Sequence, residues 1–187
     1  RQMCIRDRSY MQKFSISNFT KRNKFTRMCI GEAVIALMKE KIFDKITILD
    51  ITRKAGVSRM TFYKYYHSKE QVVESYLQEI ISGYVEKFGD NFSDDFPNFD
   101  NTLAALNYFD EYADFFLEIT QAGLYNLLIN ALNLYMEETI VPRYNVSPYK
   151  IYYYAGALLN IFIKWEESGK NIDAETIAKT IASIKLN

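Results

Sequence analysis

The chain has 187 residues, of which 49% are hydrophobic and 25% are charged, a balance typical of a folded soluble protein rather than a disordered one. No stretch approaches the ~18 consecutive apolar residues that a membrane-spanning helix needs, because even the most apolar window, 155–163, contains Asn160. Cys4 and Cys29 form no CxxC or zinc-type cluster, so we expect neither a disulfide framework nor a metal site. We expect the protein to be cytoplasmic.

The net charge is zero, but the charges are unevenly distributed. Residues 1–70 contain 16 Lys and Arg and 6 Asp and Glu, a net charge of +10, whereas residues 71–187 contain 7 and 17, a net charge of −10. A basic nucleic-acid-binding module joined to a second module has this charge pattern. Chance drift of surface charges is the alternative interpretation.

The first ten residues, 1–10, show no helical or strand periodicity and precede a candidate start at Met11. We set them aside from the fold prediction as a candidate non-native leader. Residues 1–19 are expected to form a flexible N-terminal extension.

Apolar residues recur at helical spacing along almost the whole remaining chain, which predicts an all-α fold. Pro142 is expected to end the helix at 123–139, and Gly169 is expected to end the helix at 148–168. The acidic segment 90–101, broken by Pro97, is interpreted as an internal loop. Nine helices are predicted, over 26–41, 47–55, 58–66, 68–89, 101–111, 112–121, 123–139, 148–168 and 173–185.

Residues 47–66 have the pattern of a helix-turn-helix. A short helix is capped by Thr47, Gly56 supplies the unusual backbone angle of the turn, and Val57 fits between the helices. Ser58 begins the second helix, on which Phe62 and Tyr66 face inward. Such a unit places the exposed face of its second helix in the DNA major groove.

The outward side chains of this second helix suit DNA. Arg59 can contact guanine edges, Thr61 a base or a thymine methyl group, and Lys64 a phosphate or a base. Hydroxyl groups of Tyr63 and Tyr65 can donate to phosphates. The predicted DNA-binding residues are therefore Thr47, Ser58, Arg59, Thr61, Tyr63, Lys64, Tyr65 and Lys69, of which Thr47 and Lys69 lie at helix starts and are expected to contact the phosphate backbone.

A plain helical hairpin with a basic surface could show the same turn pattern. The wider segment argues against it, because residues 27–72 resemble, without gaps, the N-terminal domain of the TetR family of transcriptional regulators. The resemblance is carried by the segments ITRKAGVS (51–58), TFYKYY (61–66) and SKE (68–70). It implies three helices that bind DNA, at 20–67, and six that bind an effector and dimerise, at 68–187.

Three positions depart from the family pattern. Thr52 stands where the family usually has alanine, and Met60 where it usually has glycine or another small residue beside the DNA. The end of the first helix also lacks the common glycine before its aromatic residue, Phe43. The substitution at Met60 leaves its role as a direct DNA contact open.

The resemblance implies that the helices at 148–168 and 173–185 form a four-helix bundle with a second subunit. Their apolar stripes favour the same arrangement, because Tyr149, Tyr152, Tyr153 and Tyr154 extend more than halfway round the first helix. A twofold dimer implies a roughly palindromic operator. The alternative is that both helices pack only within their own subunit.

The segment 108–135 is rich in aromatic residues that could line an effector cavity, although aromatics at helical spacing are more often plain core. Its nearby carboxylates could favour a cationic effector or form a solvated face; they are Asp110, Glu111, Asp114 and Glu118. The candidate effector-binding residues are Tyr108, Tyr112, Phe116 and Tyr125.

Two functions therefore stay open. The first is a homodimeric, ligand-responsive transcriptional regulator, expected to be a repressor. The second is a DNA-binding regulator controlled by a protein partner that docks on the C-terminal region. An enzyme is disfavoured, because His67 is the only histidine and no glycine-rich phosphate loop is present. We expect no catalytic residue, no metal, no cofactor and no membrane partner.

Overall fold

The computed structural model describes residues 21–89, 98–144 and 147–184. Every regular element in these residues is a helix, which confirms the all-α prediction. The elements are α2 Lys21–Met38, η2 Phe43–Lys45, α3 Ile48–Ala55, α4 Arg59–Tyr65, α5 Lys69–Phe88, α6 Phe99–Asp110, α7 Ala113–Gln121, α8 Tyr125–Tyr135, η4 Met136–Ile140, α9 Val141–Tyr144, α10 Pro148–Glu167 and α11 Ala174–Ala182. Because η4 joins α8 to α9 without a break, the described residues form nine helices besides the short 3-10 turn η2.

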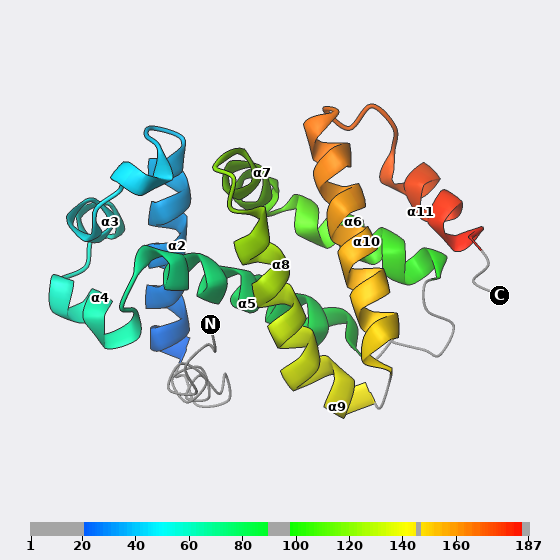
Figure 1. The fold of residues 1–187 in the computed structure, drawn as a ribbon, viewed down its shortest axis with the longest axis horizontal. Helices are drawn as coiled ribbons and strands as arrows, with labels where there is room; N and C mark the ends of the chain where they lie inside the picture. Colours follow the sequence, from blue (N-terminus) through cyan, green and yellow to red (C-terminus); the bar gives the residue numbers. More distant parts are fainter. Residues whose placement is uncertain (1–20, 90–97, 145–146, 185–187) are drawn as a thin grey trace, which may run out of the picture.

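The helices are arranged in two groups that are joined by α5 (Figure 1). At one end of the molecule, α2 packs against both α3 and α5. Farther along, α5 packs against α6 and α8, and α7 also contacts α2. The helix α5 therefore belongs to both groups.

Helix α5 is buried on most of its circumference, because other helices surround it. Eleven of its side chains are buried, among them Val72, Leu77, Ile80 and Tyr84. The apolar ones belong to one connected hydrophobic core that extends from α2 to α11. At ~25 cal/mol per Å² of apolar area removed from water, this burial is the main driving force for the joining of the two groups.

The helix that begins at Tyr125 continues past Pro142 to Tyr144, so the prediction that Pro142 ends it is wrong. A proline inside an α-helix lacks a backbone donor, and its ring clashes with the carbonyl four residues earlier, here that of Glu138. Glu138 lies in the π-helical turn η4, where the Val141 N–H donates to the Met136 carbonyl, five residues back. The wider turn accommodates the proline.

Other differences from the expected elements are small. The first helix begins at Lys21 and ends at Met38, earlier than expected at both ends. The expected N-terminal extension and most of the expected loop 90–101 lie outside the described residues. Within the described ranges, no helix is both long and apolar enough to cross a lipid bilayer.

Candidate nucleic-acid interface

Helix α3 begins with a reciprocal cap made by Thr47 and Asp50. The Asp50 N–H donates to Thr47 Oγ1 (3.2 Å), and the Thr47 N–H donates to Asp50 Oδ2 (2.9 Å). Lys41 Nζ lies 2.6 Å from the same carboxylate oxygen. The hydrogen bonds from Lys41 and from Thr47 hold the pKa of the Asp50 carboxyl well below its usual range. Asp50 therefore stays ionised and fixes the start of α3.

Gly56 ends α3 in the left-handed conformation, with φ at +66°. The Gly56 N–H donates to the Arg53 carbonyl (3.3 Å), and the Val57 N–H donates to the Thr52 carbonyl (3.0 Å). The backbone angle, and not a lack of space, explains the glycine, because an added Cβ would meet no atom within 4 Å. This turn sets the direction in which α4 leaves α3.

Helix α4 is capped at its start and packed on one side only. Ser58 Oγ accepts a hydrogen bond from the Thr61 N–H at 3.0 Å. Phe62 and Tyr66 are almost fully buried, and their rings lie 5.7 Å apart. The opposite side of the helix is left on the surface.

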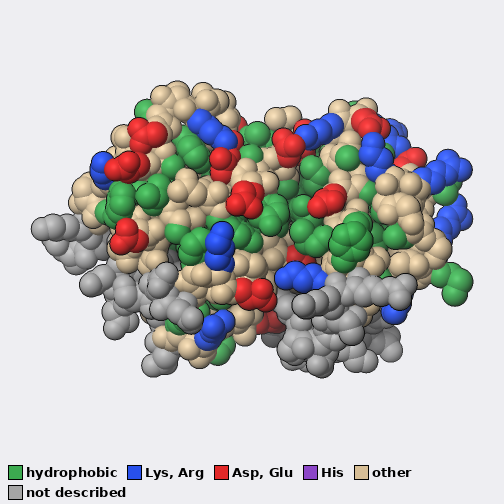
Figure 2. Space-filling view, turned by 180° about the vertical axis from the view of Figure 1, so that it is seen from behind, with side chains coloured by type: hydrophobic (Ala, Val, Ile, Leu, Met, Phe, Trp, Pro, Cys, Tyr) green, Lys and Arg blue, Asp and Glu red, His purple; other side chains and the backbone are tan. Residues whose placement is uncertain are grey.

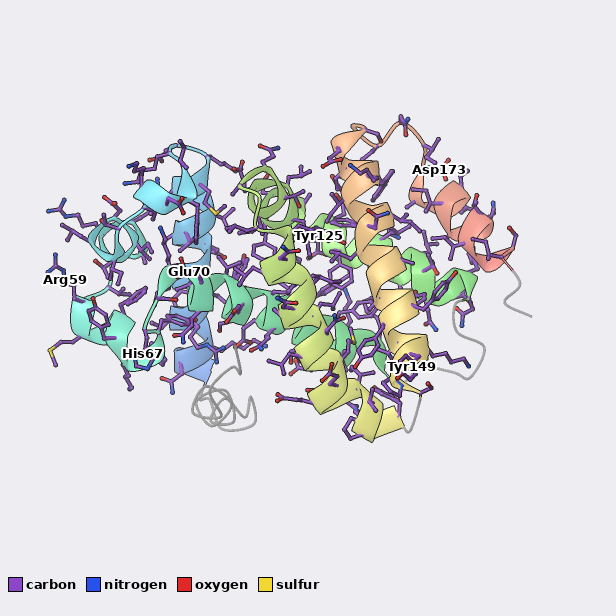
Figure 3. The ribbon with its side chains drawn as sticks, in the orientation of Figure 1. Arg59, His67, Glu70, Tyr125, Tyr149 and Asp173 are labelled. Carbon is purple, nitrogen blue, oxygen red and sulfur yellow. The ribbon has the colours of Figure 1, made fainter. Side chains whose placement is uncertain are left out.

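Five of the eight predicted DNA-binding residues are exposed: Thr47, Ser58, Arg59, Tyr63 and Lys64. Arg59 extends from α4 away from the rest of the molecule (Figure 3). Lysine and arginine side chains are gathered at the end of the molecule that carries α3 and α4 (Figure 2). This surface has the charge that a polyanion requires.

The other three predicted residues are half-buried and make internal contacts. The hydroxyl groups of Thr61 and Ser58 lie 2.9 Å apart in one hydrogen bond. The Tyr65 hydroxyl donates to Asn23 Oδ1 on α2 at 2.9 Å. These contacts occupy the hydroxyls that sequence reasoning assigned to a base or a phosphate.

Lys69, the third half-buried residue of the predicted set, also makes internal contacts. Its ammonium group donates to the carbonyls of Phe43 (2.6 Å) and Ile46 (3.4 Å), and lies 4.5 Å from the centre of the Phe43 ring. The lysine thus ties the start of α5 to the turn that precedes α3. In this structure, Lys69 positions the helix-turn-helix.

A buried polar cluster that sequence reasoning missed joins α2, α4 and α5. Arg27 Nη2 lies 3.2 Å from Glu79 Oε1 and also donates to Ser75 Oγ, and Arg27 Nε donates to the Tyr66 hydroxyl at 3.4 Å. Tyr66 in turn donates to Ser75 Oγ at 3.2 Å, and burial raises the pKa of its hydroxyl. The available signal was an arginine three residues before Ile30, which at helical spacing lies on the apolar side of this helix.

A second candidate site is an apolar cavity of about 80 Å³ in the other group of helices. Its walls come from α5, α6, α7, α8, η4 and α10, and carry no charged side chain. Its aromatic residues are Tyr84, Phe109, Phe116, Tyr154 and Phe162. The Tyr84 hydroxyl donates to the Asn101 carbonyl (3.2 Å), and the Tyr154 hydroxyl lies 3.4 Å from Thr102 Oγ1, so both are held by α6.

Of the four candidate effector residues, only Phe116 lines this cavity. Tyr108 is buried elsewhere and donates to the Ile80 carbonyl at 3.0 Å. Tyr112 precedes α7 and Tyr125 begins α8, and neither lines the cavity. The cavity draws its walls from helices far apart in the sequence, and most of its lining lies outside the segment 108–135.

The four carboxylates considered for a cationic effector also lie outside the cavity lining. Asp110 pairs with Lys170, and Asp114 pairs with Lys39. Among the described residues, no group of three or more His, Cys, Asp or Glu is placed to hold a metal ion.

The last two helices leave apolar surface uncovered. Tyr149 and Tyr153 on α10 are 80% and 51% exposed. Helix α11 packs mainly on α6 and buries Ile177 and Ala178. A shallow apolar groove between α10 and α11 includes Tyr153, Ile161, Ile181 and Ile184.

Comparisons with known proteins agree with the helix-turn-helix. Residues 30–76 match the family model of the bacterial regulatory proteins of the tetR family. The chain is 30% identical over 99 residues to the HTH-type dhaKLM operon transcriptional activator DhaS of Lactococcus lactis, which covers 53% of this chain and 51% of that protein. It is also 34% identical over 64 residues to the uncharacterized HTH-type transcriptional regulator YxbF of Bacillus subtilis, which covers 34% of this chain and 17% of that protein.

Among solved structures, the fold is similar to that of Lin0861 from Listeria innocua. The TM-score is 0.73 at 20% identity, and the match covers 88% of this chain and 91% of the other. The chain spans about half of DhaS and about a sixth of YxbF. These curated relatives are named as regulators of transcription, and none of the comparisons indicates an enzyme family.

Proposed function

We propose that this protein, whose residues 30–76 match the tetR family of bacterial regulatory proteins, binds a DNA operator as a homodimer and is controlled by a small apolar effector. The observation that carries the proposal is the exposed, basic outer side of α4, held on a buried aromatic face by Phe62 and Tyr66. Residues 20–67 form the DNA-binding part of this proposal, and residues 68–187 the effector-binding and dimerisation part.

Two exposed residues of α4 are assigned different roles toward DNA. Lys64 contacts a phosphate, a sequence-independent contact whose strength falls with salt, whereas Arg59 contacts a guanine edge. The variant Lys64→Ala should weaken binding to every duplex and lower the slope of log K against log[salt] by about one. The variant Arg59→Ala should relax sequence preference as well.

The test begins with selection of duplexes from a random double-stranded DNA library, followed by fluorescence anisotropy with the selected duplex at several salt concentrations. Lys87→Ala serves as the control, because Lys87 is an exposed lysine in the last turn of α5, at the end of that helix farther from α4. Unchanged affinity in both α4 variants would remove α4 from the interface and contradict the proposal.

The homodimer is supported by the uncovered apolar surface of α10 and α11. Tyr149, Tyr153 and Ile184 are each at least half exposed, and a second copy would cover them as a twofold partner. Two recognition helices would then lie about 34 Å apart, one turn of DNA, on a roughly palindromic operator. In analytical ultracentrifugation, Tyr153→Asp should shift the protein toward the monomer mass, while a monomeric native protein would contradict the dimer.

The cavity between α5 and α10 is the proposed effector site. Its uncharged lining favours an apolar ligand and disfavours the cationic one that was considered from the sequence. At about 80 Å³ it is smaller than a ~150 Å³ cavity that holds benzene, so a ligand must push the surrounding helices apart. That displacement would reach α5 and, through α5, the spacing of the two recognition helices.

Toluene is a suitable probe of this site. It should raise the Tm of the native protein in a concentration-dependent way, by mass action, and Ala155→Leu should abolish the rise because Ala155 lines the cavity. An equal rise in both proteins would place toluene elsewhere. Absence of any rise would favour the alternative of control by a protein partner.

The expected repressor activity is part of the proposal, although DhaS is named an activator. A reporter gene placed downstream of the selected duplex separates the two signs of regulation. Expression of the protein should lower the reporter signal if it is a repressor, and raise it if it is an activator.

A further inference from the structure

The recognition helix α4 exposes two large apolar side chains, Met60 and Tyr63, and Met60 is the more exposed of the two. At 85%, its exposed fraction is the highest among the exposed large hydrophobic side chains of the described residues. Exposure of a flexible thioether side chain stabilises nothing in the free protein, since apolar surface in water is unfavourable. A partner surface that covers it would therefore gain apolar contact.

The helix geometry directs Met60 away from the protein core. Met60 and Lys64 lie two positions before and after Phe62, which at 3.6 residues per turn places each about 160° around the helix from Phe62. Phe62 is fully buried, so these two side chains lie on the side of α4 that is farthest from the core. In a helix-turn-helix, that side enters the groove, and residues near the start of the helix contact base edges.

In the first turn of α4, Met60 is the side chain best placed for an apolar contact with a base. The Thr61 hydroxyl is hydrogen-bonded to Ser58, and Thr61 is half-buried. Arg59 lies about 60° around the helix from Phe62, nearer the flank than the outer pole. A methionine offers a base no strong donor or acceptor, but it can pack against the C5-methyl group of thymine in the major groove.

We propose that Met60 is a specificity-determining residue that contacts a thymine methyl group in each half of the operator. The inference rests on the proposed DNA-binding function and adds to it the base that this position selects. Uracil in place of that thymine removes only the methyl group, so it isolates the contact without changing base pairing.

The experiment uses the full chain and a duplex selected from a random double-stranded library. Each thymine of the selected duplex is replaced in turn by deoxyuridine, and Kd is measured for the native protein, for Met60→Ala and for the control Ile172→Ala. Alanine ends at Cβ and so is too short to reach the methyl group. Ile172 is also an exposed apolar residue, but it adjoins Asp173 at the opposite end of the molecule from Arg59 (Figure 3).

In the native protein and in Ile172→Ala, uracil at one thymine per half-site should weaken binding about fourfold, the effect of losing one buried methyl group. In Met60→Ala the same substitution should change Kd by less than about 1.5-fold. A uracil penalty that persists in Met60→Ala, or no penalty in the native protein, overturns the assignment of Met60 while DNA binding stands. If no duplex is bound at all, the proposed function fails and the inference fails with it.

Discussion

The helix-turn-helix and the cavity region are stabilised by different kinds of contact. Around α3 and α4, polar contacts with fixed geometry supplement the apolar packing: the Thr47–Asp50 cap, the Ser58 cap, and the hydrogen bond from Lys69 to the Phe43 carbonyl. Around the cavity, apolar side chains and aromatic rings make contacts with little directional preference. The first region is therefore suited to holding one geometry, and the second to repacking around a ligand.

The largest expected effect comes from breaking the buried ion pair beneath α4. Glu79→Leu leaves the Arg27 guanidinium buried without its carboxylate and should lower the free energy of unfolding by about 3–5 kcal/mol, measured by urea denaturation. The double variant Arg27→Met/Glu79→Leu removes both charges and should recover much of that loss. Equal losses in the single and double variants would show that the cost is one of packing and not of charge.

The next effect concerns the turn between α3 and α4. Gly56→Ala places a Cβ in the left-handed conformation and should destabilise the protein by about 1–2 kcal/mol in thermal or urea unfolding. Gly56→Asn is the matched control, because asparagine tolerates this conformation better, and it should be the milder of the two. If alanine were as stable as glycine, backbone geometry would not limit this turn.

A smaller effect of opposite sign is expected in the cavity region. Ala155→Leu extends a side chain into the cavity and should raise the free energy of unfolding by about 1 kcal/mol. The control Ala178→Leu enlarges a fully buried alanine between α11 and α6 and should lower it by about 1–3 kcal/mol through overpacking. Destabilisation by both variants would mean that the cavity walls do not accommodate added volume.

The smallest effect is the pH dependence of the α3 cap. Because the folded pKa of Asp50 lies below its ordinary value of ~3.9, the carboxylate stabilises the fold above that value and loses this effect as the pH falls below it. The Tm difference between the native protein and Asp50→Asn should stay constant from about pH 7 to pH 5 and shrink below about pH 4. A difference that does not change with pH would assign the effect to hydrogen-bond geometry alone.

The sequence predicted the features whose partners are close along the chain. The caps at Thr47 and Ser58 each satisfy a backbone N–H three residues later, and Gly56 acts within its own turn. Such contacts leave a local pattern of residue types. The all-α class and the TetR resemblance followed from the same short-range patterns and are confirmed.

The sequence did not predict contacts between distant residues. Arg27 meets Glu79 across 52 positions of chain, and the cavity brings Phe116 on α7 to Tyr154 and Phe162 on α10. Periodicity indicates that such residues face inward, but not which neighbour they meet. For the same reason, the half-buried positions of Tyr65 and Lys69 were not foreseen, since their partners lie 42 and 26 residues away.

Helix α5 has a mechanical consequence that follows from its length. At 1.5 Å per residue its 20 residues span about 30 Å, with Ser75 and Glu79 in the polar cluster and Leu77, Ile81 and Tyr84 in the cavity wall. A rigid rod of that length that tilts by about 5° at one end moves its other end by about 2–3 Å. In the proposed effector mechanism, a tilt of this size would move Lys69, and with it the turn before α3, by a comparable distance.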